Sequence, residues 1–135
     1  MKKVFLYLLV AIIVVNIVGC GKDDSNDNLP ESLYYVKYEA KSSFNGWQST
    51  NSLDVTYTTE KGIKQQSISG YGRGHSWEGS YGPFSKGAVL NLTIKSSNSS
   101  AEVSGKLYIS RENSPFVIKE EETGQRQITL TYIIE

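Results

Sequence analysis

The clearest structural signal in the chain is the stretch KGAVLNLTIKS, residues 86–96. Apolar and polar side chains alternate along it with a period of two, which is the spacing of residues on one face of a β-strand. The stretch therefore predicts a strand with one face buried and the other in water. Its inward set is Ala88, Leu90, Leu92 and Ile94, and its outward set is Asn91, Thr93 and Lys95.

The same alternation recurs on both sides of this stretch. It is clear in residues 33–42, 53–58, 101–110 and 128–134, and shorter or weaker in 63–69, 75–81 and 116–121. The polar character of 63–69 indicates an edge strand. No window of 11 or more residues after the first 30 has a period of 3.6, so we expect essentially no helix there. Seven or eight short strands predict an all-β fold, an antiparallel β-sandwich, with a small closed β-barrel as the alternative.

Turn signals separate these strands. Lys61-Gly62 supplies a residue suited to positive φ, as a tight hairpin requires. We expect further turns at Gly82-Pro83, Ser97–Ser99 and Thr123-Gly124, and a break at Asn113–Pro115. Short strands with short connections favour antiparallel neighbours.

The first 19 residues have the layout of a secretory signal peptide. Met1–Lys3 is basic, and the uncharged run Val4–Val18 spans roughly 22 Å as a helix. This is short of the bilayer core, which is about 30 Å thick, so a signal is favoured over a transmembrane span. The run ends at Cys20, the only cysteine in the chain, so no disulfide can form within it.

The sequence Ile17-Val18-Gly19-Cys20 resembles the bacterial lipoprotein signal. The resemblance implies cleavage after Gly19 and a diacylglyceryl group on Cys20. Two acyl chains hold a protein stably on a membrane without a protein span. We therefore expect residues 1–19 to be removed and the chain to be anchored to membrane lipid through Cys20.

Residues 20–30 are expected to form a disordered acidic tether, because 21–28 contain no apolar side chain. Lys22-Asp23-Asp24 resembles the export signal of surface lipoproteins in Bacteroidota. That resemblance implies an outer-membrane protein facing the cell exterior, with the periplasmic face as the alternative. Residues 31–135 then make one β-sandwich domain.

Two stretches of that domain, Asp54–Tyr57 and Gly82–Lys86, resemble small immunoglobulin-like sandwich domains of Bacteroidota lipoproteins. The resemblance implies an immunoglobulin-like fold and no particular activity. Loss of Lys2 and Lys3 with the signal leaves 12 basic against 14 acidic side chains, a net charge near −2. This balance offers no basic stripe for phosphates, so nucleic acid is not expected as a partner.

Aromatic and glycine residues concentrate in 70–87, which holds half of the chain's 12 glycines. Rings next to charged side chains can stack on sugars or hold a partner protein. The structural alternative is that Trp77 plugs one end of the sandwich while the glycines permit turns. The candidate ligand-binding residues are Trp47, Tyr71, Arg73, His75, Trp77, Glu78 and Tyr81.

Catalysis is the weaker hypothesis. His75 is the only histidine, and a hydrolase would need it to converge with Glu78, yet no serine lies in a Gly-x-Ser-x-Gly elbow. Zinc sites use three or four protein ligands, mostly histidine and cysteine, and one histidine without a free cysteine does not supply them. We predict no catalytic residue, metal or cofactor. The expected function is a membrane-anchored lipoprotein with a non-enzymatic role in binding or envelope assembly, with a glycan-binding module as the alternative.

Overall fold

The computed structural model describes residues 31–44 and 50–135. The expectations for the signal peptide, for Gly19 and Cys20, for the tether and for Trp47 concern residues outside these ranges, so they stay predictions. Within the described ranges, no helix is long and apolar enough to cross a membrane.

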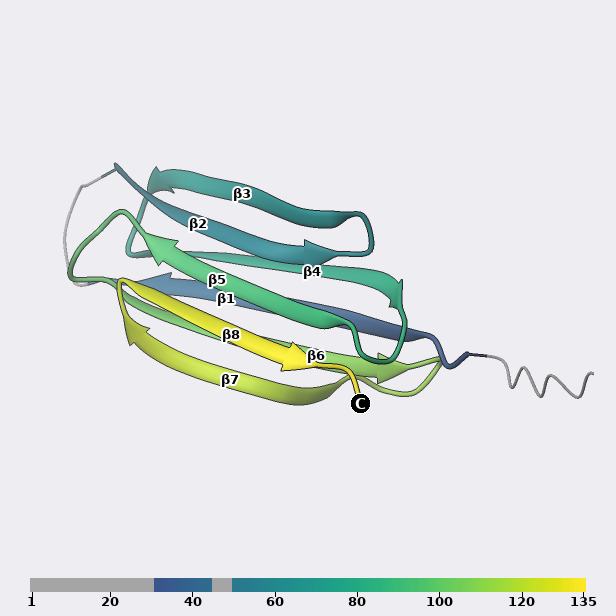
Figure 1. Ribbon diagram of the computed structural model, residues 1–135. Coiled ribbons are helices and arrows are strands. Elements are labelled where there is room, and N and C mark those ends of the chain that lie inside the picture. The colour runs from purple at the N-terminus through teal and green to yellow at the C-terminus, as the bar shows by residue number, and fades with distance from the viewer. Residues whose placement is uncertain (1–30, 45–49) are drawn as a thin grey trace, which may run out of the picture.

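In these described ranges, eight antiparallel strands form two four-stranded sheets that pack face to face (Figure 1). Sheet A has the order β4-β1-β6-β7, and sheet B has the order β3-β2-β5-β8. Across the described residues there is no helix, and neither sheet closes on itself. The predicted β-sandwich is therefore confirmed. The strands are β1 (Tyr34–Ser43), β2 (Thr50–Thr59), β3 (Gly62–Tyr71), β4 (Gly74–Phe84), β5 (Val89–Ser96), β6 (Glu102–Arg111), β7 (Val117–Gln125) and β8 (Gln127–Ile133).

The order of the strands reflects two nested units. In the first, the β2–β3 hairpin lies in sheet B while its flanking strands β1 and β4 pair in sheet A. In the second, the β6–β7 hairpin lies in sheet A while β5 and β8 pair in sheet B. The β1–β6 and β2–β5 pairings join the two units. The central strands of each sheet therefore come from both halves of the chain.

The connections between strands gather at the two ends of the sandwich (Figure 1). At the proximal end, residues 31–33 lead into β1, and the connections 60–61, 85–88 and 112–116 lie beside them. The distal end carries the connections 72–73, 97–101 and 126. A ten-residue strand is about 33 Å long, so the two ends are separated by about that distance.

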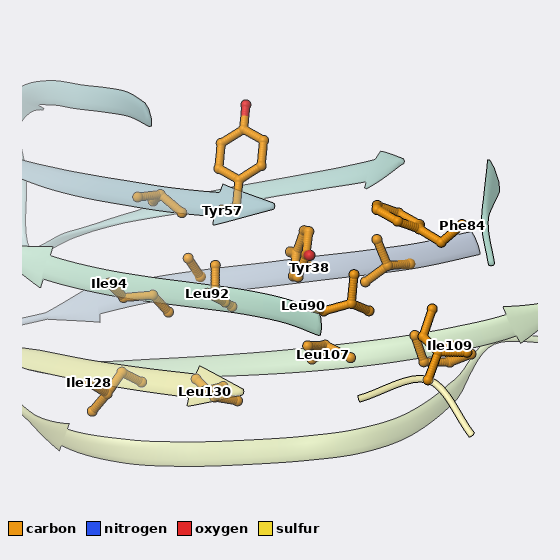
Figure 2. Packing of buried hydrophobic residues seen from close by; sticks show 14 of the residues in the cluster. Tyr38, Tyr57, Phe84, Leu90, Leu92, Ile94, Leu107, Ile109, Ile128 and Leu130 are labelled. Atoms are coloured by element: carbon orange, nitrogen blue, oxygen red, sulfur yellow. The ribbon is translucent and has the colours of Figure 1, made fainter. Parts of the chain in front are cut away.

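The core lies between the sheets and follows the alternation of the strands. Leu90, Leu92 and Ile94 of β5 are fully buried, as residues 86–96 predict, and Ala88 packs partly buried beside them. Tyr38 of β1 and Leu107 of β6 meet them from the other sheet (Figure 2). The Tyr38 hydroxyl donates to the Thr58 carbonyl at 3.0 Å, which satisfies its polar group inside the core.

Three expected boundaries are wrong. β5 begins at Val89, because residues 86–88 belong to the preceding connection. β4 continues through Gly82-Pro83, and its last residue, Phe84, is buried opposite Tyr34. An edge strand tolerates proline, because the missing N–H would point to solvent.

The third correction concerns the turn expected at Thr123-Gly124, which lies inside β7. A Cβ on Gly124 would come within 2.8 Å of Ile128 Cγ2, so the glycine serves close packing. The turn itself forms at Arg126, whose φ of 65° lies in the left-handed region.

Replacing Leu92 by alanine should lower the free energy of unfolding by about 2–5 kcal/mol, because it removes buried methyl groups and leaves a cavity. Urea denaturation followed by tryptophan fluorescence measures this change. The control is Thr93→Ala, next to it on the outer face, which should cost less than about 1 kcal/mol. Equal losses from the two variants would contradict the assignment of inward and outward faces.

Candidate functional site

Four of the predicted binding residues lie on β4, and the alternation of that strand divides them between two faces. His75, Trp77 and Tyr81 are half-buried and point toward sheet B. Glu78 is exposed on the outer face of sheet A, where it is paired in register with Glu39. These residues therefore do not form one common site.

The half-buried rings of β4 close the side of the sandwich next to β3. The ring of Tyr57 lies 4.6 Å from that of Trp77 and 4.9 Å from that of Tyr81, centroid to centroid. The Trp77 Nε1–H donates to Gln66 Oε1 at 3.1 Å, which ties β4 to β3. Burial, above all, raises the pKa of the Tyr81 and Tyr38 hydroxyls, so both are neutral at physiological pH. Trp77 therefore has a packing role, but it fills the side of the sandwich next to β3 and not one end, where the structural alternative placed it.

His75 is held between the sheets by two hydrogen bonds. Its Nε2–H donates to the Asn51 carbonyl at 3.1 Å, and its backbone N–H donates to Ser42 Oγ at 3.2 Å. Glu78 lies on the opposite face of the same strand. The structure does not bring the two side chains together, so it offers no support for the hydrolase arrangement.

The remaining two candidates lie at the distal end, Tyr71 as the last residue of β3 and Arg73 in the connection from β3 to β4. Tyr71 is 80% exposed, and Arg73 is exposed two residues later. The Phe44 backbone N–H donates to the Arg73 carbonyl at 2.9 Å, which ties this connection to the end of β1. Glycine is required at Gly74, where a Cβ would lie 2.0 Å from the Ser42 carbonyl oxygen. The glycine-rich segment thus lets the chain cross closely from sheet B to sheet A.

The described residues form two polar hollows at this end of the molecule. One, of about 380 Å³, lies on the outer face of sheet A, and the other, of about 570 Å³, extends from it toward Arg73. They share Ser43 and Glu102, so they form one continuous surface. We call it the distal polar surface; its main side chains are Lys41, Ser43, Arg73, Ser76, Glu102, Ser104 and Gln125.

Of these main side chains, sequence reasoning identified only Arg73, although His75, another predicted binding residue, also lines the first hollow. The other side chains come from four different strands, so their proximity depends on the pairing of β4, β1, β6 and β7. One signal was available: short hydroxyl side chains occupy outward positions of β1, β4 and β6, and small side chains leave a hollow between longer ones. Two cations, one carboxylate and several hydroxyls suit polar or charged ligands approached from solvent.

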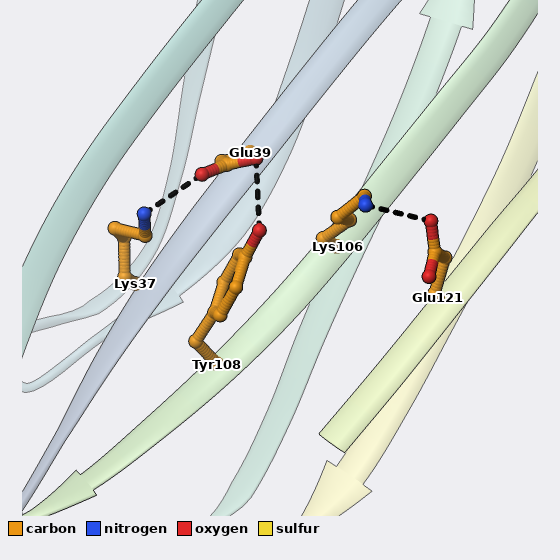
Figure 3. Close-up of polar contacts among 5 residues, drawn as sticks. All are labelled: Lys37, Glu39, Lys106, Tyr108 and Glu121. Atoms are coloured by element: carbon orange, nitrogen blue, oxygen red, sulfur yellow. Dashed lines mark hydrogen bonds and ion pairs between the residues drawn. The ribbon is translucent and has the colours of Figure 1, made fainter. Parts of the chain in front are cut away.

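A polar network covers the outer face of sheet A beside the hollows (Figure 3). Glu39 accepts from Lys37 Nζ at 2.7 Å and from the Tyr108 hydroxyl at 3.0 Å. Lys37 Nζ also lies 4.4 Å from the centroid of the Tyr108 ring, and Lys106 pairs with Glu121 at 2.8 Å. The hydrogen bond from Lys37, with that from Tyr108, lowers the pKa of Glu39 despite its partial burial. These contacts hold three strands in register next to the distal polar surface.

In residues 31–44 and 50–135, no group of three or more histidine, cysteine, aspartate or glutamate side chains is placed to hold a metal ion. Compared with known proteins, the chain matches no family model, no curated protein and no solved structure.

Glu39→Gln should reduce the amount by which the free energy of unfolding falls between pH 6 and pH 3. The pKa of Glu39 is lowered in the folded state, so its contribution is complete above the ordinary value of 4.5 and disappears as pH falls through the folded pKa. Urea denaturation at pH 6 and at pH 3 measures the difference. Tyr108→Phe removes one of the two donors and should give an intermediate result. A Glu39→Gln protein that parallels the wild type across this range would contradict the role of the network.

Proposed function

We propose that the protein is a lipid-anchored envelope lipoprotein whose sandwich domain has a non-enzymatic role in binding or assembly. The lipoprotein-like sequence Ile17–Cys20 supports the anchor. The single structural observation that carries the binding role is the position of the distal polar surface. Residues 31–33 enter β1 at the proximal end, so this surface lies at the opposite end, about one strand length of 33 Å away.

This arrangement places the distal polar surface at the end of the domain opposite the one at which the anchored chain would enter. Lys41 and Arg73 supply positive charge, Glu102 supplies a carboxylate, and serine hydroxyls supply further donors and acceptors. Such a surface suits an envelope protein or a polar polymer. The sequence Lys22-Asp23-Asp24 favours display on the cell exterior, with the periplasmic face as the alternative.

A glycan is the second candidate ligand, and one observation favours it. The Tyr71 ring is 80% exposed at the end of β3, two residues before Arg73. An exposed ring costs free energy to hydrate and offers a flat apolar face on which a sugar ring can stack. By contrast, Trp77 and Tyr81 pack against Tyr57, so they offer less of their surface to a ligand.

Cys20→Ala should abolish lipid labelling and release the protein from the membrane fraction or leave an uncut precursor. The reason is that two acyl chains provide the stable part of the attachment. Metabolic labelling with a fatty acid and fractionation of cells measure both effects. Ser25→Ala, a small change in the same N-terminal segment, is the control and should leave labelling intact. A Cys20→Ala protein that remains labelled and membrane-bound would refute the anchor.

Tyr71→Ala should weaken binding to a retained glycan by about tenfold or more, since loss of one central aromatic contact costs at least about 1.4 kcal/mol. The full-length protein is screened on an array of bacterial-envelope and host glycans, and affinities are then measured by calorimetry. The control is Thr129→Ala, at an exposed position on the outer face of sheet B. An array without hits, or unchanged affinity in Tyr71→Ala, would remove the glycan hypothesis and leave the protein partner.

A further inference from the structure

Large apolar side chains that remain exposed are concentrated at the proximal end. Eight such side chains occur among the described residues, and only Tyr71 lies at the distal end. The other seven are between 41% and 74% exposed. We call them the proximal apolar ring; they are Leu33, Ile63, Val89, Phe116, Val117, Ile118 and Ile133.

Strand topology explains why these residues share one end. Leu33 precedes β1, Ile63 is the second residue of β3, and Val89 opens β5. Val89 is paired in register with Ile133, the last residue of β8, so these two lie side by side. The β7 members begin beside the end of β6 (Figure 1). All seven side chains therefore lie toward the end at which the chain enters the domain.

The core does not need these side chains. Leu90 and Ile134, next to Val89 and Ile133, are the residues that fill the interior, while their exposed neighbours face water. Between β7 and β8 the ring borders a hollow of about 390 Å³ whose lining includes Val117. Exposed apolar surface of this kind marks a contact with a membrane or a partner.

Charges of both signs are mixed at the proximal end, so attraction to a partner of one charge does not explain the ring. The basic side chains there are Lys61, Lys86 and Arg111, and the acidic ones are Glu31, Glu60, Glu112 and Glu135. The occupant must therefore be recognised mainly by its apolar character. Basic side chains at the rim can still extend toward lipid phosphates while their stems stay in apolar surroundings.

The length of chain before the domain indicates which apolar surface is available. Ten residues separate Cys20 from Glu31, and even fully extended they reach only about 35 Å. An anchor at Cys20 would thus keep the proximal end within that distance of the bilayer, while the distal end lies about one strand length farther away. Tethering at this range raises the effective concentration of the bilayer at the ring, so even a weak contact becomes populated.

We infer that the proximal apolar ring docks on the lipid bilayer to which the chain is anchored, which rests on the lipid anchoring proposed above. Its side chains enter the boundary between headgroups and acyl chains, and Phe116 is suited to that interface. Docking orients the sandwich upright and directs the distal polar surface away from the membrane. The ring therefore acts as a second, reversible contact that sets the orientation of the domain.

Site-directed fluorescence on the full acylated protein tests this inference. Cys20 would be blocked by its thioether, so a cysteine introduced by Phe116→Cys, Ile133→Cys or Tyr71→Cys is the only reactive thiol for an environment-sensitive dye. The protein is reconstituted in phosphatidylcholine vesicles that carry nitroxide-labelled lipid. Quenching should be at least fivefold stronger at positions 116 and 133 than at 71. Equal quenching at the three positions would overturn the inference.

A charge variant tests the apolar nature of the contact. Val89→Asp combined with Phe116→Asp, read from a dye at Ile133→Cys, should reduce quenching to the level of the Tyr71→Cys protein. Gln65→Asp with Thr129→Asp adds the same charge at exposed positions of sheet B outside the ring and should leave quenching unchanged. If both pairs reduce quenching equally, general repulsion explains the effect and the inference fails.

Two further measurements separate the remaining outcomes. Mass spectrometry of the same preparation reports the acyl chains, so an unmodified Cys20 refutes the anchor, whereas acylation without quenching refutes only the docking. The dye at position 116 or 133 could instead become shielded from water only when the density of protein on the vesicles is raised. This result would identify a second copy of the chain as the occupant. That result also overturns docking on lipid.

Discussion

The structure depends on the exclusion of water from the space between four central strands. Val36 of β1, Val55 of β2, Leu92 of β5 and Leu107 of β6 are all fully buried, and they come from both halves of the chain. Each strand gains its buried face only when the opposite sheet is in place, because an isolated sheet would leave that face in water. Gly105 shows how close the packing is: a Cβ there would lie 2.6 Å from Ile94 Cδ1.

The edges of the sandwich are closed by different means. Aromatic stacking of Trp77 and Tyr81 on Tyr57 fills the side between β3 and β4. The side between β7 and β8 is narrow at Gly124, which packs against Ile128. Two of the four edge strands, β3 and β7, also carry charge on inward positions, which discourages pairing with another chain. On β3 this charge is Lys64, paired with Tyr57; on β7 it is Glu120 and Glu122, paired with Leu107 and Gly105.

With the inner faces buried and the edges protected in this way, the two ends of the sandwich are the parts that differ most in chemical character. The distal end carries a polar surface with Arg73, Lys41 and Glu102, and the proximal end carries apolar side chains such as Phe116 and Ile133. This polarity along the strand direction follows from the topology, which brings turns from both halves of the chain to each end. An anchored domain with one apolar and one polar end has a preferred orientation at a membrane.

The sequence by itself determined the strands, their inward faces and the two-layer class, because a period of two is a local property of each segment. The sequence also held the information that the side chains of His75 and Glu78 lie apart, because residues three positions apart on one strand point to opposite faces of the sheet. Boundaries at Gly82-Pro83 and Thr123-Gly124 were misjudged, because burial of Phe84 and packing of Gly124 outweigh local turn preference. Only the tertiary structure decided which strands are neighbours, and therefore which side chains share a surface. The distal polar surface and the proximal apolar ring join residues far apart in the chain, and their proximity is a consequence of long-range pairing that no local pattern encodes.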